Sequence, residues 1–417
     1  MPEIEKINKL DEKFKKVRNT TIRLISPLKK EDMVVQCGKD ASPIRWHLAH
    51  TTWFFEKFVL KKYVKNYREF NKSYDFLFNS YYETVGSFFP KILRGTQSRP
   101  DIDEILEYRK FVEESVEKNR ELFERKDIRS LMELGINHEQ QHQELMLMDV
   151  KYNFYNNPTM PEYIHNNVDT RIDSSELEYL HFNGGLYNIG YSGGDFSFDN
   201  ETPKHKAYLE KFQISSRLIT NGEYLGFIES GGYEKPELWL SDGWQMIKKE
   251  HIKMPLYWLK KDDELNTFNL DGLKPLNPHE PVSHLSYYEA DAYASWVKKR
   301  LPREEEWEVA FGTLCPSSDD NFMESGIYHP TAMKEKTRFQ ALGDLWEWTM
   351  SPYTPYPGSK PLSGSVGEYN HKFMSGQMVL RGGSCVTPGD HMRPTYRNFF
   401  SPQKRWMFSG LRLAGDD

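Results

Sequence analysis

The pattern of the sequence changes abruptly near residue 156, and this change limits the fold to two parts of different class. Over the first 155 residues, apolar side chains recur at three- and four-residue spacing with few glycines, most regularly in 45–63, 102–125 and 127–154. That spacing is typical of helices that bury one face against each other. We therefore predict a small helical bundle over residues 1–155.

The rest of the chain has no such regularity. Pro158 and Pro161 lie in a polar stretch, which predicts a linker over residues 156–176. Beyond it the chain is rich in Gly, Trp and Tyr, with short strand-like pieces between long loops, and only 287–299 has strong helical spacing. We expect a second domain over 177–417, so the fold class is α+β with two domains.

Three helix starts carry their own signals. Ser42 precedes Pro43, which predicts an N-cap followed by proline in the first turn. Asp101 after Pro100 and Ser286 before residue 287 are predicted to begin helices in the same way.

Composition excludes several classes of function. There are 55 basic and 61 acidic residues without a basic stripe, so nucleic acid is not an expected partner. No run approaches eighteen apolar residues and the charged N-terminus lacks the apolar core of a signal peptide, so no membrane segment or leader is expected. Three scattered cysteines are too few for a disulfide framework. A cytoplasmic location is the expectation.

The sharpest local signal is HEQQH at residues 138–142. On a helix His138 and His142 lie one above the other on the same face, with Cβ atoms about 5–6 Å apart, so both imidazoles can bind one metal ion. Histidines at this spacing also occur as ordinary surface or core residues. A third ligand is therefore needed before a metal site is predicted.

The predicted third ligand lies upstream, in RWHLAHTTWFFEKF. His50 shares a helix face with Trp46 and Phe54, which points it into the bundle, whereas His47 lies about one turn earlier and is the alternative ligand. If the two helices pack antiparallel, three imidazoles form a facial site with open positions. Such a site suits iron(II), which must bind a substrate and O₂ together. We therefore predict an Fe(II) cofactor.

The five letters HEQQH also match the H-E-x-x-H motif of zinc hydrolases, in which the glutamate is the general base. That reading needs a third ligand, usually downstream, and an edge strand upstream that binds the substrate. The helix is followed by VKYNFYNN, without a matching His or Glu pattern, and the upstream segments are helical. A zinc hydrolase remains the alternative interpretation.

Two stretches of the sequence resemble known protein families. RWHLAHTTWFFE followed by HEQQHQEL resembles the DinB-like four-helix bundle of EgtB-type ergothioneine-biosynthesis iron enzymes. FNGGLYNIGY, GDLWEWTMSPY and LRGGSC resemble the formylglycine-generating-enzyme (sulfatase-modifying factor) fold, a variant of the C-type lectin fold. Formylglycine generation is not expected, because it uses a cysteine pair near the end of that domain and only Cys385 is present there.

The resemblance implies an oxygenase that joins hercynine (trimethylhistidine) to a thiol with O₂ and forms a sulfoxide. It implies His50, His138 and His142 as iron ligands. It also implies that Gln141 hydrogen-bonds the imidazole of hercynine, a role that suits an amide with both a donor and an acceptor.

The thiol substrate is predicted from a loop near the C-terminus. Family members use γ-glutamylcysteine or free cysteine, and the first type carries Trp-Asp after Arg-Asn. Here Asn398 is followed by Phe399 and Phe400, so free cysteine is predicted and γ-glutamylcysteine remains the alternative. All three residues are predicted to bind substrate, with the two phenylalanines against the trimethylammonium group, which ring faces attract.

Residues after the first predicted helices complete the expected site. FNSYYETVG resembles the branch of the family with paired active-site tyrosines, so Tyr81 and Tyr82 are the predicted proton or hydrogen donors. The Arg/His/Pro-rich stretch typical of that branch reads SFFPKILRGTQSRP here, which leaves Arg94 and Arg99 as predicted carboxylate anchors.

Two other functions stay open. An ovothiol-type enzyme would join cysteine to unmethylated histidine, but such proteins commonly append a methyltransferase domain, and the sequence has no Gly-rich nucleotide loop. A lectin-like binding protein with a degenerate bundle would perform no redox chemistry.

Overall fold

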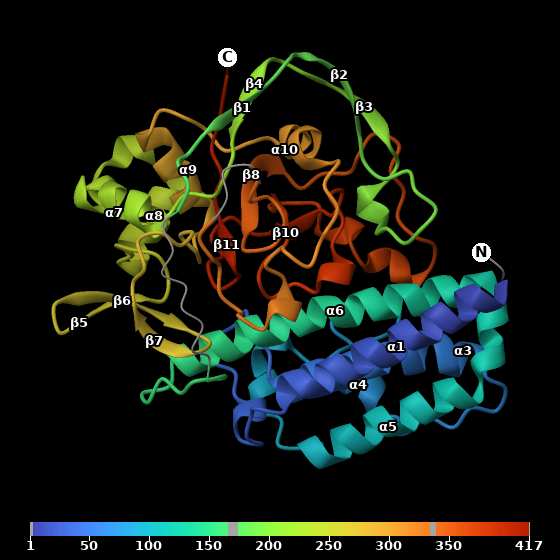
Figure 1. Cartoon of the computed structure of the whole chain (residues 1–417). Coiled ribbons are helices and arrows are strands. Elements are labelled where there is room, and N and C mark those ends of the chain that lie inside the picture. Colours follow the sequence, from blue (N-terminus) through green and yellow to red (C-terminus); the bar gives the residue numbers. More distant parts are fainter. Residues whose placement is uncertain (1–2, 166–173, 334–338, 417) are drawn as a thin grey trace. The chain divides into compact units, whose positions relative to one another are not determined.

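The computed structural model describes residues 3–165, 174–333 and 339–416, and the chain divides into two compact units (Figure 1). The first unit comprises residues 1–163 and 362–369, and the second comprises 164–361 and 370–417. The division after residue 163 falls inside the segment predicted as a linker, part of which lies outside the described residues. The return of 362–369 to the first unit was not predicted.

The first unit consists of packed helices, as the apolar spacing predicted. The α-helices are α1 (Glu3–Ile25), α2 (Ile44–Phe55), α3 (Lys61–Tyr63), α4 (Tyr74–Phe78), α5 (Ile102–Lys118) and α6 (Lys126–Tyr155). A π-helical turn at Glu56–Leu60 joins α2 to α3. Helix α1 packs on α6, and α2 packs on both α5 and α6; Figure 1 shows α1, α5 and α6 side by side.

Local signals decide some helix starts and fail at one. Asp101 caps α5 by accepting a hydrogen bond from the Glu104 amide at 3.0 Å, as predicted. The predicted Ser42 cap is wrong, because Pro43 occupies the N-cap position of α2 and no side chain caps the helix. The Ser42 hydroxyl instead accepts a hydrogen bond from Arg94 at 3.0 Å. A long-range partner has replaced the local one.

Helices α2 and α6 approach closely at a single glycine. Gly135 lies in the middle of α6, and a Cβ atom added there would lie 2.5 Å from the Phe55 ring and 2.9 Å from the Phe54 ring. A glycine normally costs a helix about 1 kcal/mol relative to alanine. Here it leaves room for two aromatic rings of α2, and these rings are fully buried.

We expect Gly135→Ala to destabilise the protein by about 1–3 kcal/mol despite the better helix propensity of alanine, because the added methyl group overpacks the contact with α2. Gly226→Ala in α7 (Asn221–Glu229) is the matched control, since the nearest atom to its added Cβ lies at 3.7 Å. The control should be neutral or more stable. Urea unfolding followed by circular dichroism measures both, and a stabilised Gly135→Ala would contradict the close approach.

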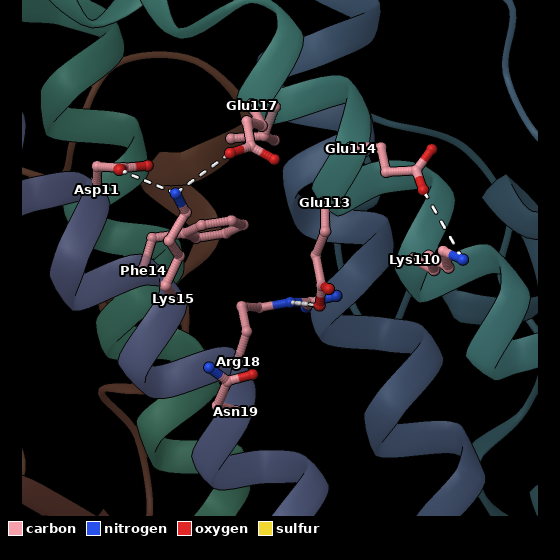
Figure 2. Close-up of a pocket in the computed structure, with 10 residues that line it drawn as sticks. Asp11, Phe14, Lys15, Arg18, Asn19, Lys110, Glu113, Glu114 and Glu117 are labelled. Carbon is pink, nitrogen blue, oxygen red and sulfur yellow. Dashed lines mark hydrogen bonds and ion pairs between the residues drawn. The ribbon is translucent and has the colours of Figure 1, made fainter.

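A groove on the first unit runs between α1 and α5, and Figure 2 shows the residues that line it. Its charged side chains pair with one another: Lys15 with Asp11 and Glu117, and Arg18 with Glu113 at 2.7 Å. Opposite charges at these distances offset each other, so this groove offers no strong field for a charged ligand.

The second unit mixes short strands, helices and long loops. Its α-helices are α7, α8 (Ser241–Glu250), α9 (Tyr287–Trp296) and α10 (Glu304–Phe311). The strands are β1 (Tyr179–Phe182), β2 (Gly185–Ile189), β3 (His205–Leu209), β4 (Phe212–Ser215), β5 (Trp258–Lys261), β6 (Glu264–Asn269), β7 (Gly272–Pro275), β8 (Trp346–Pro352), β9 (Met378–Arg381), β10 (Asn398–Phe400), β11 (Ser409–Gly410) and β12 (Ala414–Asp416).

Four sheets form from these strands. Their orders are β1-β4-β12, β10-β9-β8-β11, β2-β3 and β5-β6-β7. All the strand pairs are antiparallel except β11 with β8. The α9 helix begins at Ser286 in a capping box with Glu289, as predicted, and ends three residues earlier than its apolar spacing indicated. Helices α7, α8 and α10 were not predicted.

The core of the second unit surrounds β8. Trp346 and Trp348 are fully buried there, and Glu347 between them accepts hydrogen bonds from Arg412 and from the Trp307 indole at 2.8 Å. These groups are structural. The three cysteines are free thiols. No helix in the described part of the chain is long and apolar enough to cross a membrane.

Candidate metal centre

Four histidines gather where α2 crosses α6. The first 163 residues contain only four histidines, His47, His50, His138 and His142, and all four are buried. Helix α2 carries the first two and α6 carries the other two. The imidazole rings of His50, His138 and His142 lie 4.6–4.9 Å apart, centroid to centroid.

Three of these imidazoles are arranged to share one metal ion. Among the described residues, His50, His138 and His142 each offer a ligand atom, and the three atoms all lie within 4.8 Å of one another. The Nε2 atoms of His50 and His138 are 3.2 Å apart. Two imidazole nitrogens bound to one ion at about 2.1 Å lie roughly 3–3.5 Å apart. The donor set therefore fits a divalent transition metal.

The electrostatics of the site keep these ligands neutral. Burial lowers the pKa of His138 to about 3. Burial, and next the neighbouring His138, lower the pKa values of His50 and His142 well below the ordinary value. A neutral imidazole has the lone pair that a metal requires.

His50 is oriented by the backbone. Its Nδ1 atom lies 2.6 Å from the carbonyl oxygen of Phe78, which can only accept, so the proton is on Nδ1 and Nε2 is free to bind a metal. His47, the alternative ligand, is outside the three-atom group. Its Nδ1 lies 2.7 Å from Nδ1 of His142 and its Nε2 lies 3.0 Å from Asp149.

Glu139 of the HEQQH sequence points away from the histidines. Its carboxylate accepts hydrogen bonds from Arg18 at 3.0 Å, Arg109 at 2.5 Å and the Thr21 hydroxyl at 2.6 Å. Burial alone would raise the pKa of Glu139, but the two arginines and the Thr21 hydroxyl together lower it to about 2. A carboxylate held by two cations is a poor general base, which argues against the zinc hydrolase.

Tyr369 is a site residue that sequence reasoning missed. Its hydroxyl donates a hydrogen bond to Oε1 of Gln141, and its ring lies 5.5 Å from the ring of His138. The segment 362–369 is attached to the first unit by Glu368, whose carboxylate accepts hydrogen bonds from the backbone amides of Glu83 and Thr84, each at 3.1 Å. No local motif marks Tyr369, because only this long-range attachment brings it to the helices.

The predicted tyrosine pair lies next to Tyr369. The rings of Tyr81 and Tyr82 are 4.6 Å apart, and Tyr81 is 6.5 Å from Tyr369. Tyr82 is fully buried against Trp53 and Phe58. Burial, followed by Tyr81 and Tyr369, raises its pKa well above the ordinary value, so it keeps its proton at neutral pH.

The two predicted arginine anchors have different surroundings. Arg94 is buried, with its guanidinium carbon 3.3 Å from the ring centre of Trp46, which itself stacks on His50. Its Nε atom has no hydrogen-bond partner among the described residues, and burial lowers its pKa to about 9. Arg99 is exposed and donates a hydrogen bond to the Ser98 carbonyl at 2.8 Å, and its part in substrate binding stays a prediction.

The remaining predicted residues belong to the second unit. Asn398, Phe399 and Phe400 form β10 and are half-buried. The Phe399 ring stacks on Tyr353 at 4.0 Å, and Phe400 packs against Trp406 at 5.4 Å. Their part in substrate binding stays a prediction.

The sulfatase-modifying factor enzyme 1-like domain family matches residues 167–341 and 335–417, which together are more than half of the chain. The chain belongs to this family. His50, His138 and His142 precede the matched region, so the family match does not cover the candidate metal centre.

The curated relatives that this chain resembles carry different names. The hercynine oxygenase of Mycobacterium tuberculosis is 35% identical over 53% of this chain and 56% of its own length. Ergothioneine biosynthesis protein 1 of Schizosaccharomyces pombe is 28% identical over 52% and 27%. The formylglycine-generating enzyme of Bos taurus is 27% identical over 56% and 73%. The chain thus spans about half the length of the hercynine oxygenases it matches.

The contribution of Glu139, which is paired with Arg18 and Arg109, to stability should depend on pH. Because the pKa of Glu139 lies at about 2, below the ordinary 4.5, its stabilisation is present above pH 4.5 and is lost as pH falls toward 2. Glu139→Gln should therefore lower the free energy of unfolding by about 3–5 kcal/mol at pH 7. The difference from wild type should shrink on acidification.

Urea unfolding of the metal-free proteins between pH 7 and pH 3 measures this difference. Glu113→Gln is the control, because Glu113 also pairs with Arg18 but is 36% exposed, and its loss should cost less than about 1 kcal/mol. A difference for Glu139→Gln that stays constant with pH would show that its charge contributes nothing.

Proposed function

We propose that this protein is an iron(II)- and O₂-dependent sulfoxide synthase that joins hercynine to cysteine. The observation that carries the proposal is the buried group of His50, His138 and His142, which offers three neutral nitrogens and leaves coordination positions free. The relatives named hercynine oxygenase and ergothioneine biosynthesis protein 1 support the choice of substrate.

The reaction balances with the three reactants alone. The C2–H bond of hercynine and the S–H bond of cysteine break, and a C–S bond forms between them. One oxygen atom of O₂ stays in the sulfoxide and the other leaves as water. Bound iron(II) supplies the redox chemistry that lets O₂ react with the two substrates.

The protein's own residues bind and orient the substrates. Gln141, with its Oε1 atom bonded to Tyr369, presents its amide N–H to a ring nitrogen of hercynine. Arg94, a buried cation with an unpartnered Nε, binds a substrate carboxylate. Phe399 and Phe400 bind the trimethylammonium group through their ring faces, and Asn398 assists them.

Tyrosine supplies the proton or hydrogen that directs oxygen toward the sulfoxide. Tyr369 is our first choice, because it contacts both Gln141 and the ring of His138. Tyr81 and Tyr82, whose rings lie next to Tyr369, are the second candidates for the proton or hydrogen donor. Free cysteine is the proposed thiol, because no acidic residue follows Asn398 to meet the ammonium group of γ-glutamylcysteine.

Replacing a ligand tests the proposal directly. His138→Ala should abolish both bound iron and sulfoxide formation, measured as metal content after anaerobic loading and as product mass. The assay supplies hercynine or histidine with cysteine and γ-glutamylcysteine in competition, so the product mass also identifies both substrates. Unchanged iron content and full activity in His138→Ala would contradict the proposal. A product formed from histidine would favour the ovothiol-type reaction.

Tyr369→Phe tests the proton donor. We expect sulfoxide formation to fall about 100-fold or more, with more of the cysteine oxidised to its sulfinic acid, because the same O₂ then ends on sulfur alone. Iron content should not change. Tyr74→Phe is the matched control, because it removes a phenol of the same unit whose hydroxyl bonds Glu104 at 2.7 Å, and it should retain most of the sulfoxide activity. A normal product ratio from Tyr369→Phe would remove that residue from the mechanism.

A further inference from the structure

His47 and Asp149 form a chain of hydrogen bonds that ends on a metal ligand. Both ring nitrogens of His47 are engaged, one by His142 at 2.7 Å and the other by Asp149 at 3.0 Å. All three side chains are buried. The same oxygen of Asp149 also accepts the backbone N–H of Ser42 at 2.8 Å, which anchors the far end of the chain to the start of α2.

The proton positions along this chain follow from what each group can do. A carboxylate oxygen that already accepts a backbone N–H can only accept again, so Nε2 of His47 carries a proton. Nδ1 of a neutral His47 is then an acceptor. The proton between the two Nδ1 atoms therefore belongs to His142, and the lone pair of His142 is on Nε2.

The opposite arrangement removes the ligand. If Nδ1 of His47 carried the proton, Nδ1 of His142 would accept the hydrogen bond. His142 would then carry its own proton on Nε2. That nitrogen would then have no lone pair for a metal ion. Only the first arrangement is compatible with the group formed by His142, His50 and His138.

We infer that His47 and Asp149 are positioning residues that fix the tautomer and the ring orientation of His142, and that His47 is not itself a ligand. The inference rests on the metal centre of the proposed function. Histidine ligands of metals generally donate their second N–H to a carboxylate or a carbonyl. Here a second histidine carries that interaction from His142 to Asp149.

The three ligands are therefore held in three different ways. His50 is held by the Phe78 carbonyl and His142 by His47. Nδ1 of His138 has no hydrogen-bond partner among the described residues, and that ring is held by packing against Phe54 and Tyr369. Loss of the His47 contact should therefore loosen one ligand and leave the other two in position.

The test is metal affinity of the full chain without substrates. Co(II) is titrated anaerobically into wild type, His47→Phe and His47→Gln in competition with a chelator. We expect His47→Phe to bind Co(II) about 10–100-fold more weakly, with a changed visible absorption spectrum. His47→Gln keeps an acceptor and a donor in one side chain and should recover most of the affinity.

A matched control separates this effect from general damage to α6. Asn153 lies one turn beyond Asp149 on α6. The variant Asn153→Ala removes hydrogen bonds to the backbone of Cys37 and Val35, which are not part of the chain from His142 to Asp149. Its Co(II) affinity should equal that of wild type. Thermal unfolding of each metal-free variant reports folding. If His47→Phe does not fold, ¹⁵N–¹H NMR of Zn(II)-loaded wild type tests the same point, because His142 must be protonated at Nδ1.

Each outcome has one meaning. Failure of wild type to bind Co(II) overturns the metal centre and with it the proposed function. Wild-type affinity and spectrum in His47→Phe, or a proton on Nε2 of His142, overturn only the positioning role. An affinity as low as that of His142→Ala, with one nitrogen fewer around the cobalt by X-ray absorption, would make His47 a ligand and overturn the inference in the other direction.

Discussion

The close contact of α2 with α6 at Gly135 is the constraint on which the metal centre depends. The glycine lets the rings of Phe54 and Phe55 pack against the α6 backbone, and His138 follows one turn later on the same side. Phe54 also packs against the His138 ring at 5.0 Å. The contact that packs the two helices therefore also positions His138, one of the proposed metal ligands.

The rotation of α6 about its axis is fixed from the opposite side. Glu139 is buried against Arg18 of α1 and Arg109 of α5, and turning it away would leave two cations buried without their counter-charge. With Glu139 held there, the neighbouring His138 must face α2. One residue of the HEQQH sequence thus orients the helix, while two others are the proposed ligands of the metal ion.

Local signals in the sequence predicted what local interactions decide. The spacing of His138 and His142, the helix face of His50, and the caps at Asp101 and Ser286 all depend on residues a few positions apart. Tyr369 was missed because its partners lie more than 200 residues away, and the burial of Arg94 against Trp46 was not visible in the sequence. The link from His47 to Asp149 likewise required the packed helices, so sequence alone left His47 as an alternative ligand.

The segment 362–369 has a consequence for how this protein can be divided. The polypeptide passes from one unit to the other three times, after residues 163, 361 and 369. A fragment cut after Tyr163 would keep every histidine of the cluster but would lose the phenol that touches Gln141. The two halves therefore cannot be exchanged between proteins as independent cassettes: a chimera joined at the obvious boundary would inherit its tyrosine from the other parent.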